Sequence, residues 1–391
     1  MIVCVIRAVL RGGCVAVDPL IRGCLPWRAF SPTGADGPRT RAGARPAAPE
    51  PEATSLTQRP HAVLAMSAAN VPLVFPPRVL ARLREALDLD PAAVAEDFTD
   101  PRLRDALARA EVLVTGWGCP RLDTAALDAV PRLRAVLHSA GSVKGLVTPE
   151  LWRRRITVTS AAAANAVPVA EYTLAMILLT GKDLLAARDR LRAERSALPG
   201  WRLLPGTGNH GRRVGVIGAS RTGRRVIELL RPFDLVTALT DPYADTADAA
   251  ALGVPLLPLD DLLRTSDVVT VHAPQTPATH HLLGARELAL MPDGAVLINT
   301  ARGPLVDHDA LTAELRTGRL SAVLDVTEPE PLPDDSPLYG LPNAFLTPHL
   351  AGSQGNEAAR LGLAVAEEAA RLRAGAAPAH PVDPAVLERE A

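Results

Sequence analysis

The chain has few cysteines, few aromatic residues and no excess of charge of either sign. Its 391 residues carry 42 Lys or Arg against 43 Asp or Glu, so we expect neither a nucleic acid nor an anionic membrane as its partner. Three of its four cysteines, Cys4, Cys14 and Cys24, lie near the start with no CxxC pair. This spacing excludes a zinc-finger framework and a disulfide scaffold, and we expect no metal site, unpaired thiols and a cytoplasmic location.

The sequence also lacks an uncharged apolar run of the ~18–20 residues that a membrane helix needs. The first residues, MIVCVIRAVLRGG, are interrupted by Arg7 and Arg11 and are not interpreted as a signal peptide. Residues 1–65 are poor in periodic apolar positions and rich in Pro, Gly, Ala and Arg, which predicts a disordered extension. Met66 is one candidate for the first residue of the native protein, and the sequence leaves this open.

From about residue 70, short apolar runs alternate with amphipathic stretches, a pattern typical of parallel sheets covered by helices. NVPLVFPP (70–77) opens the first series as a strand, RVLARLREALDL (78–89) is a helix, and EVLVTGWG (111–118) and LRAVLHSAGS (133–142) contain two further strands. Residues 165–195 predict one long helix whose early part is buried between domains or subunits. Further strands are predicted at 214–218, 235–240, 267–273, 295–300, 321–326 and 344–349. The predicted fold is α/β, with two doubly wound domains.

The stretch VGVIGASRTGRRV (214–226) has the order strand, tight turn and helix start. It fits the dinucleotide fingerprint G-x-G-x-x-G at Gly218 and Gly223, but Ser220 replaces the second glycine. Alone, such a turn is almost as often purely structural. Asp241 ends the next predicted strand, where an acid takes the ribose hydroxyls and repels a 2′-phosphate, although it is also typical of a simple turn. The sequence therefore favours NAD as the cofactor over NADP.

Three chemically active side chains each follow a predicted strand of the second series: Arg302, Glu330 and His349. Doubly wound sheets bind ligands outside the carboxyl ends of their strands, so the three could converge on one pocket. Taken singly, each is more typical of a surface arginine, a solvated glutamate and a turn histidine. One shared pocket accounts for all three together, which favours a functional interpretation.

Five motifs in order give residues from about 70 to 380 a specific resemblance to the D-isomer-specific 2-hydroxyacid dehydrogenase family. They are NAVPVAEYTLAMILL (165–179), VHAPQTPATHHLL (271–283), NTARGPLVD (299–307), LDVTEPEPLP (324–333) and LTPHLAG (346–352). The resemblance implies a flavodoxin-like substrate domain over 66–164, completed by 350–391, and a Rossmann NAD-binding domain over 165–349. It also implies a homodimer across the cofactor domains.

The same resemblance implies a role for each residue of the expected site. Arg302 would bind the substrate carboxylate, His349 would be the acid/base and Glu330 its partner. Glu328 competes with Glu330, but the family places its glutamate five residues after an aspartate, here Asp325, which selects Glu330. Asp325 would hold the nicotinamide carboxamide.

Further implied contacts surround this set. The cofactor is expected to touch Gly218, Ser220, Arg221, Thr222, Gly223, Asp241, Ala273, Pro274, Thr279, Thr300, Ala301, Arg302, Asp325, His349 and Gly352. The substrate is expected to meet the backbone of Gly141, Ser142 and Val143, with Lys144 adding charge or being merely solvated, and Trp117 either shapes the pocket or packs in the core. Ser220 and Thr327, where the family usually has an aromatic residue, depart from the family pattern.

The expected activity is transfer of a hydride between NAD(H) and a small 2-oxo acid or D-2-hydroxy acid. Such a reaction needs a hydride donor, a proton donor and a cation for the carboxylate, and a guanidinium and an imidazole supply the last two. One alternative is a non-catalytic NAD(H)-sensing regulator or corepressor on the same scaffold. Another is a hydrolase that uses bound NAD internally, against which the NTARG and TPH motifs argue.

Overall fold

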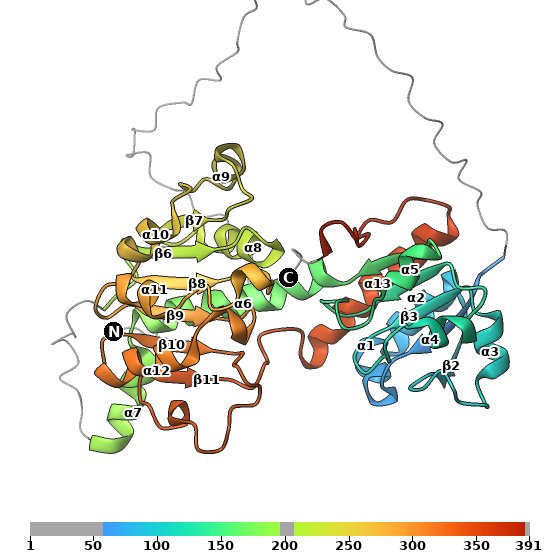
Figure 1. The fold of residues 1–391 in the computed structure, drawn as a ribbon, viewed down its shortest axis with the longest axis horizontal. Helices are drawn as coiled ribbons and strands as arrows, with labels where there is room; N and C mark the ends of the chain where they lie inside the picture. Colours follow the sequence, from blue (N-terminus) through green and yellow to red (C-terminus); the bar gives the residue numbers. More distant parts are fainter. Residues whose placement is uncertain (1–57, 196–206, 388–391) are drawn as a thin grey trace, which may run out of the picture. The chain divides into compact units, whose positions relative to one another are not determined.

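The computed structural model describes residues 58–195 and 207–387 of the chain. Two parallel β-sheets, each covered by helices on both faces, make up this part (Figure 1). The prediction of an α/β fold with two doubly wound sheets is thus confirmed. The predicted disorder of residues 1–57 lies outside the described residues.

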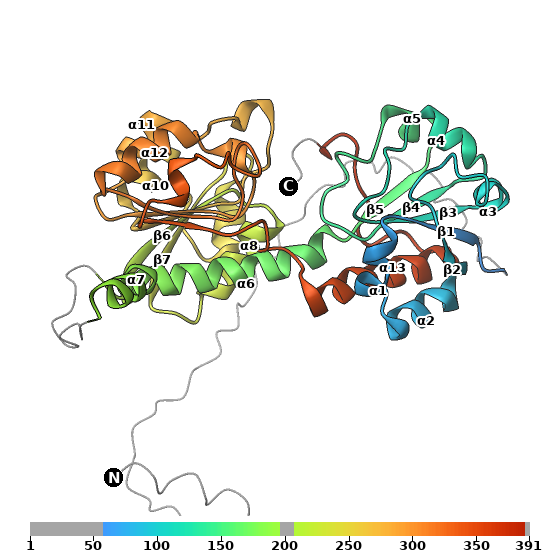
Figure 2. The ribbon, with the colours of Figure 1, turned by 90° about the horizontal axis from the view of Figure 1, so that it is seen from below.

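The first sheet has five parallel strands in the flavodoxin-like order β2-β1-β3-β4-β5. Helices α3 to α5 cover one face, and α1, α2 and α13 cover the other (Figure 2). Because alternate strand residues point to opposite faces, Val63 packs under the first group and Leu64 under the second. The strands are β1 (His61–Ala65), β2 (Asp88–Val94), β3 (Val112–Thr115), β4 (Ala135–His138) and β5 (Thr157–Ser160), and the helices before β5 are α1 (Val71–Val74), α2 (Pro77–Ala86), α3 (Arg104–Arg109), α4 (Thr124–Ala129) and α5 (Pro149–Arg153).

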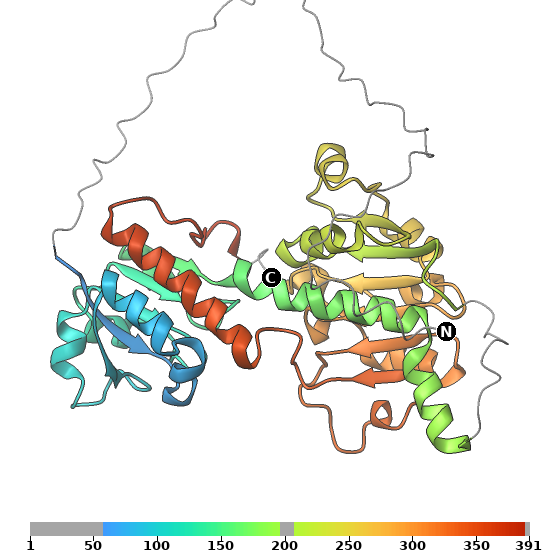
Figure 3. The same cartoon turned by 180° about the vertical axis from the view of Figure 1, so that it is seen from behind.

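The last described segment of the chain returns to this first sheet. Helix α13 (Ala358–Arg373) packs against α2, as Figure 3 shows, and buries Leu361 and Val365 in the same core. Beyond it, the N–H of Val382 donates to the carbonyl of Val158 in β5 at 2.8 Å. The first sheet is therefore completed by residues far away in the sequence.

The start of the first domain differs from the sequence-based expectation. Residues 61–65, expected to be disordered, form β1, which pairs with both β2 and β3 and is a central strand. The short apolar run HAVLA was masked by the Pro- and Ala-rich stretch before it. Residues 71–74, expected as a strand, form α1 instead, because a proline near a helix start is pre-organised for that conformation. Met66 is fully buried directly after β1, so a chain that began there would lack this strand.

The second sheet has six parallel strands in the order β11-β10-β9-β8-β6-β7. All six lie where strands were predicted: β6 (Arg212–Ile217), β7 (Leu235–Thr240), β8 (Val268–Val271), β9 (Val296–Asn299), β10 (Ser321–Leu324) and β11 (Ala344–Leu346). Their helices are α8 (Arg221–Leu230), α9 (Thr246–Leu252), α10 (Leu259–Thr265), α11 (Ala285–Leu290) and α12 (His308–Thr317), and short 3₁₀ turns of the chain are η1 (Ala68–Asn70), η2 (Pro277–Thr279), η3 (Gly303–Leu305), η4 (Pro337–Tyr339) and η5 (Gly355–Glu357). Since β6 lies between β7 and β8, the strand order reverses direction there, which is the usual ligand position in such sheets.

The predicted helix 165–195 is two helices, α6 (Ala162–Gly181) and α7 (Leu184–Glu194). They are separated at Asp183, whose φ of +50° ends the helical path. Helix α6 packs against α8 and buries Ala170 and Ile177 in the core of the second sheet. Contrary to the expectation that no segment is long enough, α6 could cross a membrane by length and composition alone. That is weak evidence, because core helices have the same composition.

Each sheet carries a buried histidine at the carboxyl end of a strand. His138 ends β4 and pairs through Nδ1 with Thr115 Oγ1 at 2.8 Å, and His272 follows β8 and pairs through Nε2 with Thr270 Oγ1 at 2.9 Å. Burial lowers the pKa of His138 to about 4 and that of His272 to about 3. Both imidazoles are therefore neutral in the folded protein at neutral pH.

These two histidines predict a loss of stability in mild acid. The unfolded chain binds protons to histidine below a pKa of ~6.5 and the folded chain does not, so stability falls as pH drops from 7 to 5. Each group should cost about 2 kcal/mol at pH 5. Urea unfolding at pH 7 and pH 5 measures this loss. Between the two pH values, the free energy of unfolding of His138→Gln should fall by less than that of the parent. His210→Gln, which changes an exposed histidine, is the control and should match the parent. An equal loss in His138→Gln would contradict the assignment.

Candidate active site

The turn after β6 is shaped for a close backbone approach. Gly218 has φ of +99°, and a Cβ there would lie 2.7 Å from the backbone nitrogen of Ala273 after β8. Gly223, in the first turn of α8, presses against the carbonyl of Gly218, so a side chain has no room there either. Ser220 does not disturb this turn: it caps α8, and its Oγ accepts from the N–H of Gly223 at 3.3 Å.

A cavity of about 620 Å³ opens beside this turn. Among its lining residues are the predicted cofactor contacts Gly218, Asp241, Ala273, Pro274 and Thr279. Arg221 and Thr222 stand in the first turn of α8, whose N-terminal N–H groups and positive dipole end suit a phosphate. A cradle that excludes Cβ atoms, a helix N-terminus and a cavity at the reversal of strand order together fit a dinucleotide.

Asp241 supports the same turn from the end of β7. Its Oδ2 accepts from the N–H of Ala219 at 2.6 Å, and its Oδ1 accepts from the N–H of Tyr243 at 2.7 Å. The carboxylate therefore serves as a turn-forming group and also lines the cavity. The two interpretations of this residue are compatible.

His349 and Glu330 are brought together after β11 and β10. The Nδ1 atom of His349 lies 2.6 Å from Oε1 of Glu330, and both side chains are about half exposed. His349 also has φ of +52°, a conformation that costs energy for a residue with a Cβ and that persists only where the surroundings enforce it. Glu330 thus orients the imidazole through Nδ1, and Nε2 remains available for proton transfer.

Asp325 enforces the conformation of the His349 loop. It is 2% exposed; its Oδ1 accepts from Thr347 Oγ1 at 2.6 Å and from the N–H of Leu350 at 2.9 Å, and its Oδ2 accepts from the N–H of Ala351 at 2.9 Å. The N–H of His349 donates to the Asp325 carbonyl at 2.9 Å. The Asp325 carboxylate therefore fixes the loop that carries His349. Asp325 also lines a cavity of about 510 Å³ together with Glu330 and His349.

Arg302 lies after β9, directly before η3, and its Nη1 donates to the Ala301 carbonyl at 2.6 Å. Burial lowers the pKa of its guanidinium, while the Glu330 carboxylate acts in the opposite direction. Arg302 lines a cavity of about 800 Å³ together with Ser142, Lys144, Gly145, Gln275, Thr276, Pro277 and His280. The arginine and the His349–Glu330 pair thus line different cavities, so the expectation of one pocket shared by all three is not met in this structure. Glu330 is close enough to Arg302 to act on the pKa of its guanidinium.

The remaining predicted residues lie either after β9 in the second domain or in loops of the first domain. Thr300 is buried and pairs with Thr173 Oγ1 at 3.1 Å, and Ala301 donates its N–H to Asn299 Oδ1 at 3.0 Å. On the first domain, Val143 is buried in the core, so only its backbone is available to a ligand. Ser142 Oγ accepts from the N–H of Lys144 at 3.4 Å, and Lys144 Nζ donates to the Gln275 carbonyl at 3.3 Å.

Trp117 is 38% exposed, so the alternative that it packs in the core is wrong.

Two supporting residues on α6 were not predicted from the sequence. Asn165 Oδ1 accepts from the N–H of Ser353 at 3.0 Å, and a Cβ on the predicted residues Gly141 or Gly352 would lie 3.3 or 3.4 Å from the Asn165 side chain. Tyr172 Oη pairs with Thr347 Oγ1 at 2.8 Å, next to Asp325. Asn165 and Tyr172 are polar residues seven apart on a mostly apolar helix and thus lie on one face, which is a signal that could have identified them.

Comparison with known proteins decides the family. The chain is 30% identical over 320 residues to the glyoxylate reductase of Korarchaeum cryptofilum, and the match covers 80% of this chain and 95% of the relative. The chain belongs to the D-isomer-specific 2-hydroxyacid dehydrogenase family. Within it, residues 174–351 match the family model of the NAD-binding domain. The resemblance inferred from the five motifs and the prediction of NAD as cofactor are confirmed.

Other members of this family are similar in part or in fold. The D-3-phosphoglycerate dehydrogenase of Mycobacterium bovis is 35% identical over 258 residues, which are 65% of this chain and 48% of that protein. The chain therefore spans about half the length of this relative. The D-lactate dehydrogenase of Aquifex aeolicus, solved with NAD and lactic acid, superposes with a TM-score of 0.61 at 26% identity, covering 80% of this chain and 94% of that one.

The role of Asp325 in shaping the candidate site can be tested by Asp325→Ala. The variant leaves three donors of the loop without their acceptor, so we expect a loss of about 3 kcal/mol in the free energy of unfolding. Chemical unfolding measures the loss. Asp335→Ala, an exposed change in a nearby loop, is the control and should leave stability unchanged. Equal stability of Asp325→Ala and the parent would show that the carboxylate does not hold the loop.

Proposed function

We propose that this dehydrogenase reduces a small 2-oxo acid to its D-2-hydroxy acid with NADH, and catalyses the reverse oxidation with NAD. The observation that carries the proposal is the 2.6 Å pair between His349 Nδ1 and Glu330 Oε1, formed at strand ends of the NAD-binding domain. A carboxylate that receives one ring N–H fixes the tautomer and orientation of an imidazole, so that the other nitrogen can exchange a proton.

Each residue then has one task in the reduction. Arg302 binds the substrate carboxylate, because its guanidinium remains charged even when partly buried and can bind a carboxylate through two parallel hydrogen bonds. When bound in the cavity beside Gly218 and Asp241, the cofactor would supply the hydride for C2 of the acid. His349 Nε2 delivers the proton to the C2 oxygen as negative charge develops there, and Glu330 stabilises the imidazolium that donates it. The oxidation uses the same groups in the reverse direction.

The substrate is proposed only as a class. The relatives are named for D-3-phosphoglycerate, glyoxylate and D-lactate, and the charge of Arg302 favours an anionic 2-oxo acid. The backbone of Gly141, Ser142 and Val143 is proposed as a second contact for the substrate carboxylate. A homodimer is proposed because α7 leaves Leu184 and Leu191 exposed. A cytoplasmic location is proposed because the sequence has only four cysteines and no CxxC pair, and Cys119 is a free thiol.

The proposed reaction is tested by NADH oxidation with glyoxylate, hydroxypyruvate, pyruvate and bulkier 2-oxo acids. We expect turnover with at least one of them and a loss of about 10²–10⁴-fold in kcat for His349→Ala, equivalent to about 3–5 kcal/mol of transition-state stabilisation. His210→Ala, an exposed histidine paired with Asp234 at 3.6 Å, is the control. No turnover with any acid, despite measurable NADH binding, would favour the regulator alternative. Activity of His349→Ala within tenfold of the parent would remove His349 from the role.

Cofactor preference is a second test, carried by Asp241. Its carboxylate repels the 2′-phosphate of NADP, so Asp241→Ala should reduce the ratio of kcat/KM for NADH over NADPH by at least about tenfold. Asp234→Ala, at the opposite end of the same strand, should leave the ratio unchanged. An unchanged ratio in Asp241→Ala would mean that Asp241 acts only as the turn-forming acceptor of Ala219 and Tyr243.

A further inference from the structure

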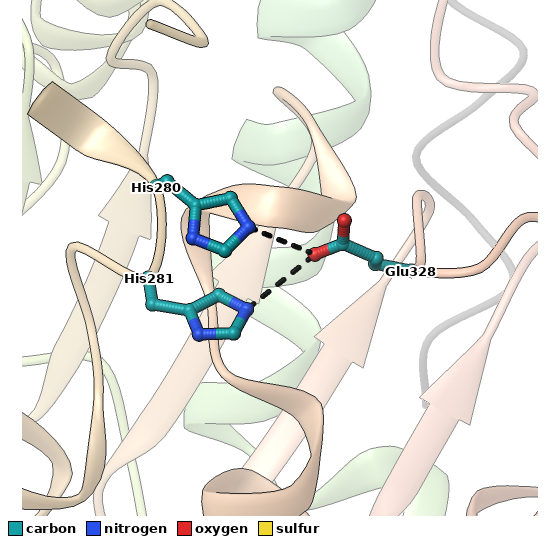
Figure 4. Close-up of side chains that lie close together, drawn as sticks. All are labelled: His280, His281 and Glu328. Atoms are coloured by element: carbon teal, nitrogen blue, oxygen red, sulfur yellow. Dashed lines mark ion pairs between the residues drawn. The ribbon is translucent and has the colours of Figure 1, made fainter. Parts of the chain in front are cut away.

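Two adjacent histidines and a glutamate form a cluster that the proposed reaction does not use. His280 and His281 follow η2, and Glu328 lies beyond β10; we call these three residues the His–His–Glu cluster. The Nε2 atom of His281 lies 3.5 Å and that of His280 3.9 Å from Oε2 of Glu328. Figure 4 shows both rings directed toward the same carboxylate oxygen. The three ligand atoms lie within 4.8 Å of one another.

The shared oxygen is in an unusual state for a carboxylate. Oε2 of Glu328 is inaccessible to solvent and has no hydrogen-bond partner among the described residues. The two imidazole nitrogens are too far away for good hydrogen bonds, and a buried acceptor left unpaired is unfavourable. An unsatisfied buried carboxylate oxygen facing two imidazole nitrogens is a site at which a cation would supply the missing partner.

The ring geometry also suits one shared cation. The two imidazoles are stacked, with centroids 4.0 Å apart and planes 24° apart. The Nε2 atoms of both rings face Oε2 of Glu328. Asp307 Oδ2 lies 3.8 Å from Nδ1 of His281, which is the ring nitrogen that the proposed metal does not use.

The backbone, and not the side chains alone, holds the cluster in place. His281 has φ of +50°, and its N–H donates to the carbonyl of Pro304 in η3 at 2.8 Å. Gly303, in the same turn, packs directly against the backbone of Thr327 and Glu328. The turn after Arg302 therefore fixes the spacing between the histidines and the glutamate, so the ligand atoms are pre-positioned.

We propose that the His–His–Glu cluster binds one divalent transition-metal ion of the Zn²⁺ class through Nε2 of His280, Nε2 of His281 and Oε2 of Glu328. Two imidazoles and one carboxylate suit Zn²⁺, Co²⁺ or Ni²⁺ and not the all-oxygen sites of Mg²⁺ and Ca²⁺. Metal–ligand bonds of ~2.0–2.1 Å place tetrahedral ligand atoms about 3.3 Å apart, so the observed 3.5 and 3.9 Å require only small side-chain movements. The sequence-based expectation of no metal site considered only cysteine spacing.

One further histidine borders the cluster. His308 begins α12, its Nδ1 lies 3.0 Å from the carbonyl of Val306, and its Nε2 is buried with no hydrogen-bond partner in the described part of the chain. Burial lowers the pKa of His308, while Glu328 acts to raise it and His281 to lower it. We keep His308 outside the ligand set, because its Nε2 does not lie within the common reach of the other three atoms.

Occupancy of the cluster would join two segments that border the candidate active site. His280 lines the same cavity as Arg302, and Glu328 lies two residues before Glu330. A bound ion would restrain both segments at once. The proposal itself concerns binding, does not depend on the identity of the substrate and is tested without an activity measurement.

The test uses the full chain without a histidine tag, freed of metal by dialysis against a chelator. Calorimetric titration with Zn²⁺ should show a site of one ion per chain, and Co²⁺ should give the visible absorption of a nitrogen- and oxygen-ligated ion that Zn²⁺ displaces. His280→Ala, His281→Ala and Glu328→Gln should each weaken binding at this site at least tenfold. His210→Ala is the matched control, because it removes an exposed histidine from the same domain and should bind like the parent.

Several outcomes would overturn the proposal. Equal Zn²⁺ affinity in His281→Ala and the parent would show that the ion binds elsewhere. A thiolate charge-transfer band in the Co²⁺ spectrum would assign binding to cysteine. Absence of binding by the parent at micromolar Zn²⁺, with the circular dichroism of a folded chain, would show that the cluster is no metal site. Circular dichroism of each variant separates lost ligands from lost fold, and the isosteric Glu328→Gln keeps the test valid if a histidine variant does not fold.

Discussion

The site depends on one buried carboxylate, that of Asp325. It collects a hydroxyl and two backbone N–H groups from residues 347–351, and its own carbonyl accepts the N–H of His349. These bonds tie the end of β10 to the loop after β11 and hold His349 in a positive-φ conformation that the residue would not adopt by itself. Charge-assisted bonds to backbone N–H groups are stronger than neutral ones, which suits a carboxylate to this task. The distance between His349 and Glu330 follows from this arrangement.

The same loop leads directly into the segment that returns to the first sheet. Ser353 donates its N–H to Asn165 near the start of α6, and α13 then packs against α2. The loop that positions the proposed proton donor is therefore continuous with one of the chain's crossings between its two domains, and α6 forms the other. A change in Asn165 would act on both crossings at once, although this residue touches neither His349 nor Glu330 in the hydrogen bonds described above.

The sequence predicts the regular parts of this molecule well, because buried parallel strands are uniform apolar runs. All six strands of the second sheet fall where the apolar runs are. The prediction failed where local signals conflict with the tertiary fold. β2 reads DLDPAAV, with charged residues and a proline, and is recognisable as a strand only through its pairing with β1. β1 is short and follows a Pro- and Ala-rich stretch, so its central position arises from tertiary pairing alone.

Strand-end position alone cannot separate a functional histidine from a core histidine. His138, His272 and His349 all end or follow strands, yet two of them are buried against threonine hydroxyls with lowered pKa values and the third is half exposed against a carboxylate. The partner decides the chemistry: a threonine hydroxyl satisfies a neutral ring, whereas a carboxylate stabilises the imidazolium that a proton donor needs.

The two glutamates of the EPEP segment illustrate the same point. The sequence left Glu328 and Glu330 as competitors for one histidine, and family spacing selected between them. The structure gives each its own partners: Glu330 contacts His349, and Glu328 faces His280 and His281. One carboxylate is within hydrogen-bond distance of its imidazole, while the other holds an unpaired oxygen between two rings. These two geometries suit a proton and a metal ion respectively, so the two positions are not interchangeable although they differ by only two residues.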